Sequence, residues 1–213
     1  MKPTKTAALR LMALSGLLPL LYVISYINTL GYPLAEPSFP QLILSAGITL
    51  LTTAVLICGI IGGIFLTAET KSFAALFFTM LSGVMLFFLI FYISIIFGTE
   101  NPLYAAFGLG DFARFSFGLT SVFYAVFLFS FAAKENRKCK IFSAAYGAFG
   151  IVGIIQYILI MVLGNRTEGG SLADPSIYSL FTMDALAVTC VIPAILGIIL
   201  LILVWKTDFF SEE

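Results

Sequence analysis

The chain is 213 residues long, with 61% hydrophobic and only 10% charged residues, and its mean hydropathy is +1.09. This composition excludes a water-soluble globular domain and indicates an integral membrane protein surrounded by the lipid bilayer. Eleven basic residues balance eleven acidic ones, so no net charge favours a nucleic-acid partner. Histidine is absent, which removes the commonest general base and metal ligand, so we expect no enzyme activity, metal or cofactor.

Six apolar runs are long enough to cross the ~30 Å hydrocarbon core of a bilayer as α-helices. They lie at about residues 8–30, 42–67, 73–97, 115–133, 141–163 and 180–205. A lipid-exposed segment must satisfy its own backbone hydrogen bonds, and these runs lack the alternation of barrel strands. The predicted fold is therefore an all-α membrane protein, a single domain of six transmembrane helices packed as a bundle.

The basic residues predict how this bundle is oriented. The densest positive cluster is the loop at residues 134–140, between the fourth and fifth runs. Lysine and arginine beside membrane spans are retained on the cytoplasmic side. With this loop inside, nine of the eleven basic residues are cytoplasmic, and only Arg114 and Arg166 lie outside. We expect both termini to be cytoplasmic and the membrane to be the bacterial cytoplasmic membrane.

The first run follows a basic N-terminus, as a secretory signal would. Its length of about 20 apolar residues exceeds the roughly 7–15 residues of a signal core, so we expect a retained first span. Pro19 lies near its middle and predicts a kink, because proline removes a backbone N–H. Asn28, near its outer end, is a candidate for lining a solute site.

Glycines mark the second and fifth runs. Gly59 and Gly63 are one helical turn apart, and Gly147, Gly150 and Gly153 recur at every third residue. Small residues let helix backbones approach closely, so both faces predict helix packing within the bundle. A subunit interface and a sliding surface for conformational change are the alternatives.

Other polar side chains give weaker signals. Thr49, Thr52 and Thr53 can donate their hydroxyls to their own helix backbone, so we expect them to mark no site. Cys139 lies among four cations in the basic loop, which favours its thiolate and makes it the one candidate reactive cysteine.

Candidate solute-binding or coupling residues lie in the later runs and in the loop before the fourth. Asp184 is the one acidic residue inside a run, and an intramembrane acid is either a functional group or a salt-bridge partner. Gln156 in the fifth run either binds solute or joins two helices. Asp111 and Arg114 are spaced to pair on one helical turn. Pro193 predicts a kink in the sixth run.

Catalytic glycine loops, CxxC pairs and GxSxG motifs are absent from the sequence. A six-helix bundle of this size is similar in outline to the substrate-binding membrane components of vitamin uptake systems and to small permease subunits, a likeness of fold alone. We therefore expect a permease or transporter membrane subunit for a small or lipid-like solute. The alternative is a non-catalytic scaffold or assembly factor that holds a partner membrane subunit or a second copy of the chain.

Overall fold

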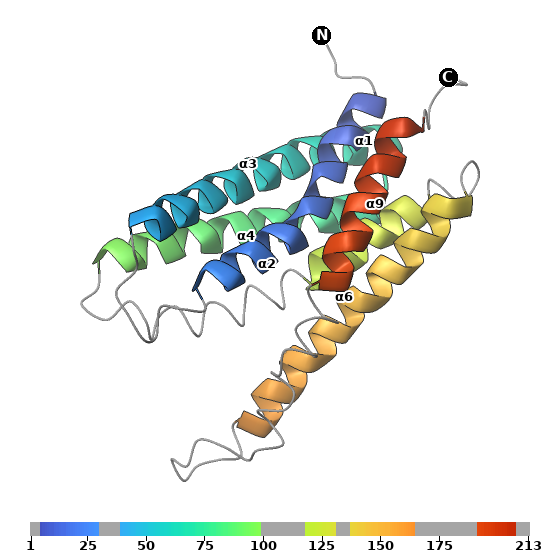
Figure 1. Ribbon diagram of the computed structural model, residues 1–213. Coiled ribbons are helices and arrows are strands. Elements are labelled where there is room, and N and C mark those ends of the chain that lie inside the picture. The colour runs from blue at the N-terminus through green and yellow to red at the C-terminus, as the bar shows by residue number, and fades with distance from the viewer. Residues whose placement is uncertain (1–4, 30–38, 99–117, 131–136, 165–190, 208–213) are drawn as a thin grey trace.

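The computed structural model describes residues 5–29, 39–98, 118–130, 137–164 and 191–207 (Figure 1). These residues are almost entirely helical and contain no strand, which confirms the predicted all-α fold for this part of the chain. The elements are α1 (Lys5–Ala13), the 3₁₀-helix η1 (Leu14–Leu17), α2 (Leu18–Thr29), α3 (Phe39–Thr70), α4 (Phe73–Gly98), a helix at Gly118–Ser130, α6 (Arg137–Gly164) and α9 (Ile192–Lys206).

Four helical stretches are long and apolar enough to cross a membrane. They are Lys5–Ser25, Phe39–Thr70, Phe73–Phe91 and Arg137–Ile155. Two shorter apolar helices, Gly118–Ser130 and Ile192–Lys206, lie within the fourth and sixth predicted runs, which extend beyond the described residues. The protein is thus compatible with a multi-pass integral membrane protein.

Large apolar side chains cover the outer faces of α3, α4, α6 and α9. Leu50 on α3 is 72% exposed, and Phe73 at the start of α4 is 78% exposed. A soluble monomer rarely exposes contiguous apolar surface of this extent, because water does not solvate it well, whereas hydrocarbon does. The outer surface therefore suits contact with lipid chains.

A two-residue turn joins α3 to α4 as an antiparallel hairpin. Lys71 adopts a left-handed conformation, with φ 51°, and its N–H donates to the carbonyl of Thr67 at 2.9 Å, which ends α3. Ser72 directly precedes α4 and caps it. Its carbonyl accepts from the N–H of Leu76 at 3.1 Å, and its hydroxyl accepts from the N–H of Ala75 at 3.5 Å. The shortness of this turn keeps the two helices side by side.

The first helix changes geometry immediately before Pro19. Proline has no N–H to donate to the carbonyl of Ser15, one turn back. The N–H of Leu18 donates to that carbonyl instead, which closes a tighter turn and produces the 3₁₀ segment η1. The described first helix is therefore α1, η1 and α2 in succession, and α1 and η1 both pack against α3 and α9.

The backbones of η1 and α9 touch at two glycines. A Cβ placed on Gly16 would lie 2.7 Å from the carbonyl oxygen of Gly197, and a Cβ on Gly197 would overlap the carbonyl oxygen of Gly16. No side chain fits between the two helices at this point. The crossing therefore requires glycine on both sides.

The glycines of α3 face two different elements. A Cβ on Gly59 would overlap the hydroxyl of Ser15 on η1, and a Cβ on Gly63 would overlap the hydroxyl of Thr79 on α4. Each glycine therefore leaves room for a polar side chain of a neighbouring helix.

Two of the three glycines of α6 face the helix Gly118–Ser130. A Cβ on Gly150 would lie 2.9 Å from the carbonyl oxygen of Gly118, and a Cβ on Gly147 would lie 2.9 Å from the Cβ of Ala125. Gly153 differs, because none of the described atoms lies within 4 Å of the place its Cβ would take. The structure therefore gives Gly153 no packing role among the described residues.

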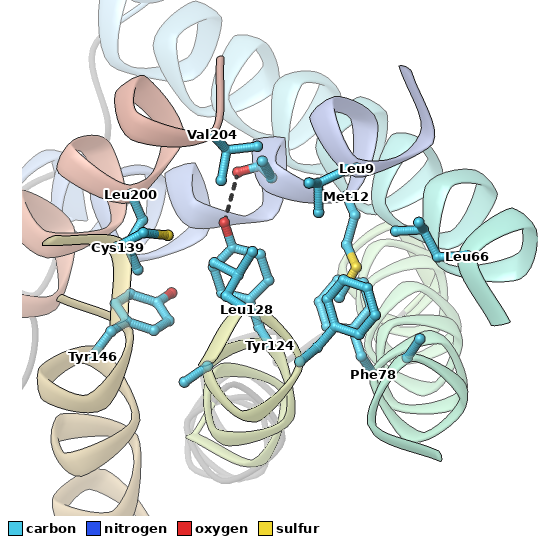
Figure 2. Close-up of a cluster of buried hydrophobic side chains, with 14 of the residues drawn as sticks. Leu9, Met12, Leu66, Phe78, Tyr124, Leu128, Cys139, Tyr146, Leu200 and Val204 are labelled. Carbon is cyan, nitrogen blue, oxygen red and sulfur yellow. Dashed lines mark hydrogen bonds between the residues drawn. The ribbon is translucent and has the colours of Figure 1, made fainter. Parts of the chain in front are cut away.

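The larger of two buried hydrophobic clusters joins α1, α3, α4, α6, α9 and the helix Gly118–Ser130 (Figure 2). Its members are Ala8, Leu9, Met12, Ala13, Leu66, Ala75, Phe78, Tyr124, Ala125, Phe127, Leu128, Cys139, Tyr146, Leu200 and Val204. The smaller cluster joins α2 and α3 through Leu18, Leu21, Ile48, Val55 and Leu56. Tyr124, placed between Phe78 and Tyr146 in Figure 2, puts the helix Gly118–Ser130 in the middle of the larger cluster.

All charged residues of the described ranges lie at one end of the bundle. This end, towards the upper right of Figure 1, contains the start of α1, the α3–α4 turn, the start of α6 and the end of α9. We call it the charged end, and its residues are Lys5, Arg10, Glu69, Lys71, Arg137, Lys138, Lys140 and Lys206. The basic loop predicted at 134–140 is corrected in part, because α6 already begins at Arg137.

The glycine crossing makes a stability prediction. Replacing Gly197→Ala places a methyl group against the backbone of η1, so we expect destabilisation by about 1–3 kcal/mol and a lower thermal unfolding temperature in detergent. Gly47→Ala on α3 is the matched control, because nothing lies within 4 Å of its Cβ position in the described structure, and alanine favours helix by up to about 1 kcal/mol. Equal stability of Gly197→Ala and wild type would contradict the crossing.

Candidate functional site

Several hydroxyl groups are buried inside the apolar bundle. We call the set the buried polar cluster, and it consists of Ser15 on η1, Ser82 on α4, Thr120, Ser121 and Tyr124 on the helix Gly118–Ser130, and Tyr146 on α6. Each of these side chains is at most 3% exposed. Polar groups in a membrane interior are costly unless they bond to protein or ligand, so their partners decide what the cluster can do.

Tyr124 ties the cluster to the first helix. Its hydroxyl donates to the carbonyl oxygen of Ala13 at 3.4 Å, the bond marked by the dashed line in Figure 2. Ala13 is the last residue of α1, directly before η1. On its other side, the ring of Tyr124 lies 5.9 Å from the ring of Phe78, measured between centroids. The change of helix geometry before Pro19 is therefore in direct contact with the centre of the bundle.

Tyr146 continues the cluster onto α6. Its ring packs edge-on against that of Tyr124, with centroids 5.7 Å apart and an interplanar angle of 76°. Its hydroxyl accepts a hydrogen bond of 3.4 Å from the hydroxyl of Ser121. The neighbouring Thr120 donates to the sulfur of Met85 at 3.3 Å. These bonds are long or weak, so they leave hydrogen-bonding capacity in the cluster.

Ser15 and Ser82 differ from the other hydroxyl residues of the cluster, and buried Ser143 on α6, outside the cluster, shares their state. Their oxygens are inaccessible to solvent and have no hydrogen-bond partner in the described part of the chain. A buried polar group without a partner costs about 1–3 kcal/mol. Unpartnered buried hydroxyls of this kind are available to hydrogen-bond a polar ligand.

The threonines of α3 show how a hydroxyl inside a helix is ordinarily satisfied. Thr49, Thr52 and Thr53 donate to the carbonyls one turn back, at 2.8–2.9 Å, which confirms the expectation from the sequence. Their hydroxyls are satisfied within their own helix. They therefore need no ligand.

The cluster has no acid, base or charged group. The described charged residues are all at the charged end, and the described residues include no group of three His, Cys, Asp or Glu that could hold a metal ion. Its hydroxyls can donate and accept hydrogen bonds, and its aromatic rings offer apolar faces. This chemistry suits binding of a polar, uncharged group.

The residues that the sequence singled out for solute binding are not among those in the cluster. Asp184, Asp111 and Arg114 lie outside the described residues. Asn28 lies in the last turn of α2 and Gln156 in α6, and for both the structure describes the backbone alone. Their role in a solute site stays a prediction.

Pro193 lies in the first turn of α9, as that helix is described. The residue two places before it, Val191, has π-helical geometry. A local departure from α-helical hydrogen bonding thus accompanies Pro193, as one accompanies Pro19.

The buried polar cluster was missed from the sequence. A signal was present, because Thr120 and Ser121 precede Tyr124 by four and three residues, so each lies on the same helix face as Tyr124. Single hydroxyl residues are common in this run, so the pattern did not distinguish a polar face. Ser15 and Ser82 gave no signal, since only the packed structure shows which hydroxyls lack partners.

The expectation for Cys139 was wrong. It lies in the first turn of α6, is 0% exposed and belongs to the buried cluster with Leu200 and Val204 of α9. Its cationic neighbours Arg137 and Lys138 are exposed on another face of the helix. The neighbours in sequence are charged, but the neighbours in space are apolar, so the thiol is shielded.

No protein-family model matches the chain, and neither a curated protein nor a solved structure is significantly similar to it.

Burial of Cys139 predicts slow modification. In a Cys58→Ser, Cys190→Ser variant, which retains Cys139 alone, we expect a maleimide reagent to label the folded protein at least about tenfold more slowly than the denatured protein. The rate is read by gel shift or mass spectrometry. Labelling of the folded protein at the rate of the denatured one would contradict the packing of α6 against α9.

Proposed function

We propose that the protein is a permease or transporter membrane subunit that binds a small or lipid-like solute at the buried polar cluster. The observation that carries this proposal is the pair of buried, unpartnered hydroxyls at Ser15 and Ser82. The proposal includes six spans, with both termini and the charged end in the cytoplasm.

The distribution of charge supports this orientation. The charged end has seven basic residues and one acidic residue among the described ranges, and the opposite end has none. Basic residues favour the cytoplasmic side of a membrane. The start of α1 and the end of α9 lie at this same end, as expected for a chain with an even number of spans (Figure 1).

The helix irregularities support a solute site near the cluster. Ser15 belongs to η1, and η1 contacts α9 through the glycine crossing. Interrupted helices that meet inside a membrane are a recurring way to present backbone and hydroxyl groups to a solute. Because the cluster is uncharged, the solute group that it would hold is a hydroxyl, an amide or a similar neutral group.

A scaffold is the second candidate, and open glycines favour it. Gly47 on α3, Gly83 on α4 and Gly153 on α6 have no described atom within 4 Å of their Cβ positions. Small residues on an outer helix face accept a partner helix. In that case Gly83→Leu would disrupt a complex with a partner subunit or a second copy, while changes in the buried polar cluster would not.

The orientation can be tested with terminal fusions. A reporter that folds only in the cytoplasm should be active at either end of the full-length chain, and a reporter active only outside the cytoplasm should be inactive at both. Activity of the two fusions on opposite sides of the membrane would contradict an even number of spans.

The solute site can be tested by thermal unfolding of the detergent-purified protein across a panel of neutral polar solutes and lipids. We expect a solute that binds to stabilise wild type by about 2–3 kcal/mol at 100-fold excess over its Kd. Ser82→Ala should lose most of this stabilisation, because a hydrogen bond to the solute is removed. Without solute it should be as stable as wild type or more stable, since its hydroxyl has no protein partner.

Two variants complete the design. Ser130→Ala is the matched control, because this exposed hydroxyl already donates to the carbonyl of Val126 at 2.8 Å, and it should keep the full solute effect. Asp184→Asn tests whether the acid predicted from the sequence contributes to the same site. A solute effect that persists unchanged in Ser82→Ala would remove the cluster from the site, and no effect of any solute would favour the scaffold.

A further inference from the structure

Arg10 lies where α1 passes the end of α9, and most of its donors have no partner among the described residues. One Nη2–H donates to the carbonyl oxygen of Trp205 at 3.5 Å, and the guanidinium carbon lies 5.9 Å from the centroid of the Trp205 rings. Nε is shielded from solvent and has no partner among the described residues. A guanidinium has five N–H donors in a planar fork that matches the oxygens of a phosphate.

Other cations lie at the same end of the bundle. Lys206 follows Trp205 on α9 and is exposed. Arg137 and Lys138 are exposed in the first turn of α6, on a face other than the one through which Cys139 packs against α9. Glu69, near the end of α3, is the one carboxylate of the described ranges. Among the described residues, positive charge therefore predominates at the charged end. We call the place where Arg10 of α1 meets the end of α9 the junction.

Helix capping accounts for only some of these cations. Lys71 ends α3, and Arg10 contacts the end of α9, where the negative end of the helix dipole favours positive charge. Arg137 and Lys138 instead lie at the start of α6, whose first turn has no acidic residue and where positive side chains are unfavourable. An anion bound at the charged end would offset the repulsion among these cations.

The surface below the junction is apolar. Trp205 is 52% exposed, and Ile202 and Ile195 are exposed on the same face of α9, at helical spacings of three and seven residues. A lipid bound with its phosphate at the charged end would lay its acyl chains along this face. A soluble phosphate compound without acyl chains would not contact this apolar face.

We propose that the junction binds an anionic phospholipid, with its phosphate held between the guanidinium of Arg10 and the ammonium of Lys206. Trp205 lies beside the headgroup, at the boundary where tryptophan is favoured. Basic residues at the cytoplasmic ends of spans attract anionic lipids in this way. This site is separate from the buried polar cluster and does not depend on the solute proposed for it.

Trp205 makes the test specific, because it is the single tryptophan of the chain. The full-length protein is reconstituted in phosphatidylcholine vesicles that contain either phosphatidylglycerol or phosphatidylcholine with brominated acyl chains, which quench tryptophan on contact. We expect brominated phosphatidylglycerol to quench Trp205 with an apparent affinity about tenfold higher than that of brominated phosphatidylcholine.

Variants and a competitor distinguish this site from other causes. Lys206→Gln, which removes an exposed charge, and Arg10→Gln should each remove most of the preference. Lys71→Gln, at the same end of the bundle but on the α3–α4 turn, should keep it. Inorganic phosphate added at constant ionic strength should leave the preference unchanged.

Three outcomes would overturn the proposal. Equal quenching by the two lipids in wild type would show that the junction does not select anionic headgroups. Equal losses in Lys71→Gln and Lys206→Gln would show a diffuse effect of charge instead of a site. Removal of the preference by inorganic phosphate would assign the junction to a soluble phosphate compound instead of a lipid.

Discussion

The backbone contact between Gly16 and Gly197 is the constraint on which the packing of the bundle depends. It brings the first and last described helices together with no side chain between them. At this separation Leu200 and Val204 of α9 enter the same buried cluster as Leu9 and Met12 of α1, and the ring of Tyr124 fills the space beneath them. A larger residue at either glycine would push these groups apart together, because the interior is close-packed.

Pro19 and two of the buried hydroxyl residues, Ser15 and Tyr124, are linked through this contact. Pro19 forces a 3₁₀ turn in the first helix, and that turn carries both Gly16 and Ser15. Gly59 on α3 leaves room for the Ser15 hydroxyl, and Ala13, just before the turn, accepts from Tyr124. One local change in backbone geometry therefore places a close approach, an unpartnered hydroxyl and a buried hydrogen bond within one stretch of chain.

The sequence predicted the features that depend on composition and on order along the chain. Helical runs, the hydroxyl bonds of Thr49 and its neighbours on α3, and the gathering of basic residues follow from hydropathy and local bonding. The prediction failed for Cys139, because α6 begins at Arg137 and not after the basic cluster. The helical periodicity of α6 then places the thiol on its buried face. The prediction also missed Ser15, Ser82 and Gly197, because the role of a single serine or glycine depends on which helix packs against it, and the sequence does not show that.

The hydrogen bond from Arg10 to the carbonyl oxygen of Trp205 joins residues 195 positions apart in the chain. During synthesis α1 is made well before its partner α9. Until α9 is made, the face of α1 that it will cover must contact other helices or lipid. Contacts of such long range form late and slow the completion of folding. Loss of α9 would leave the face of the first helix around Gly16 without its partner.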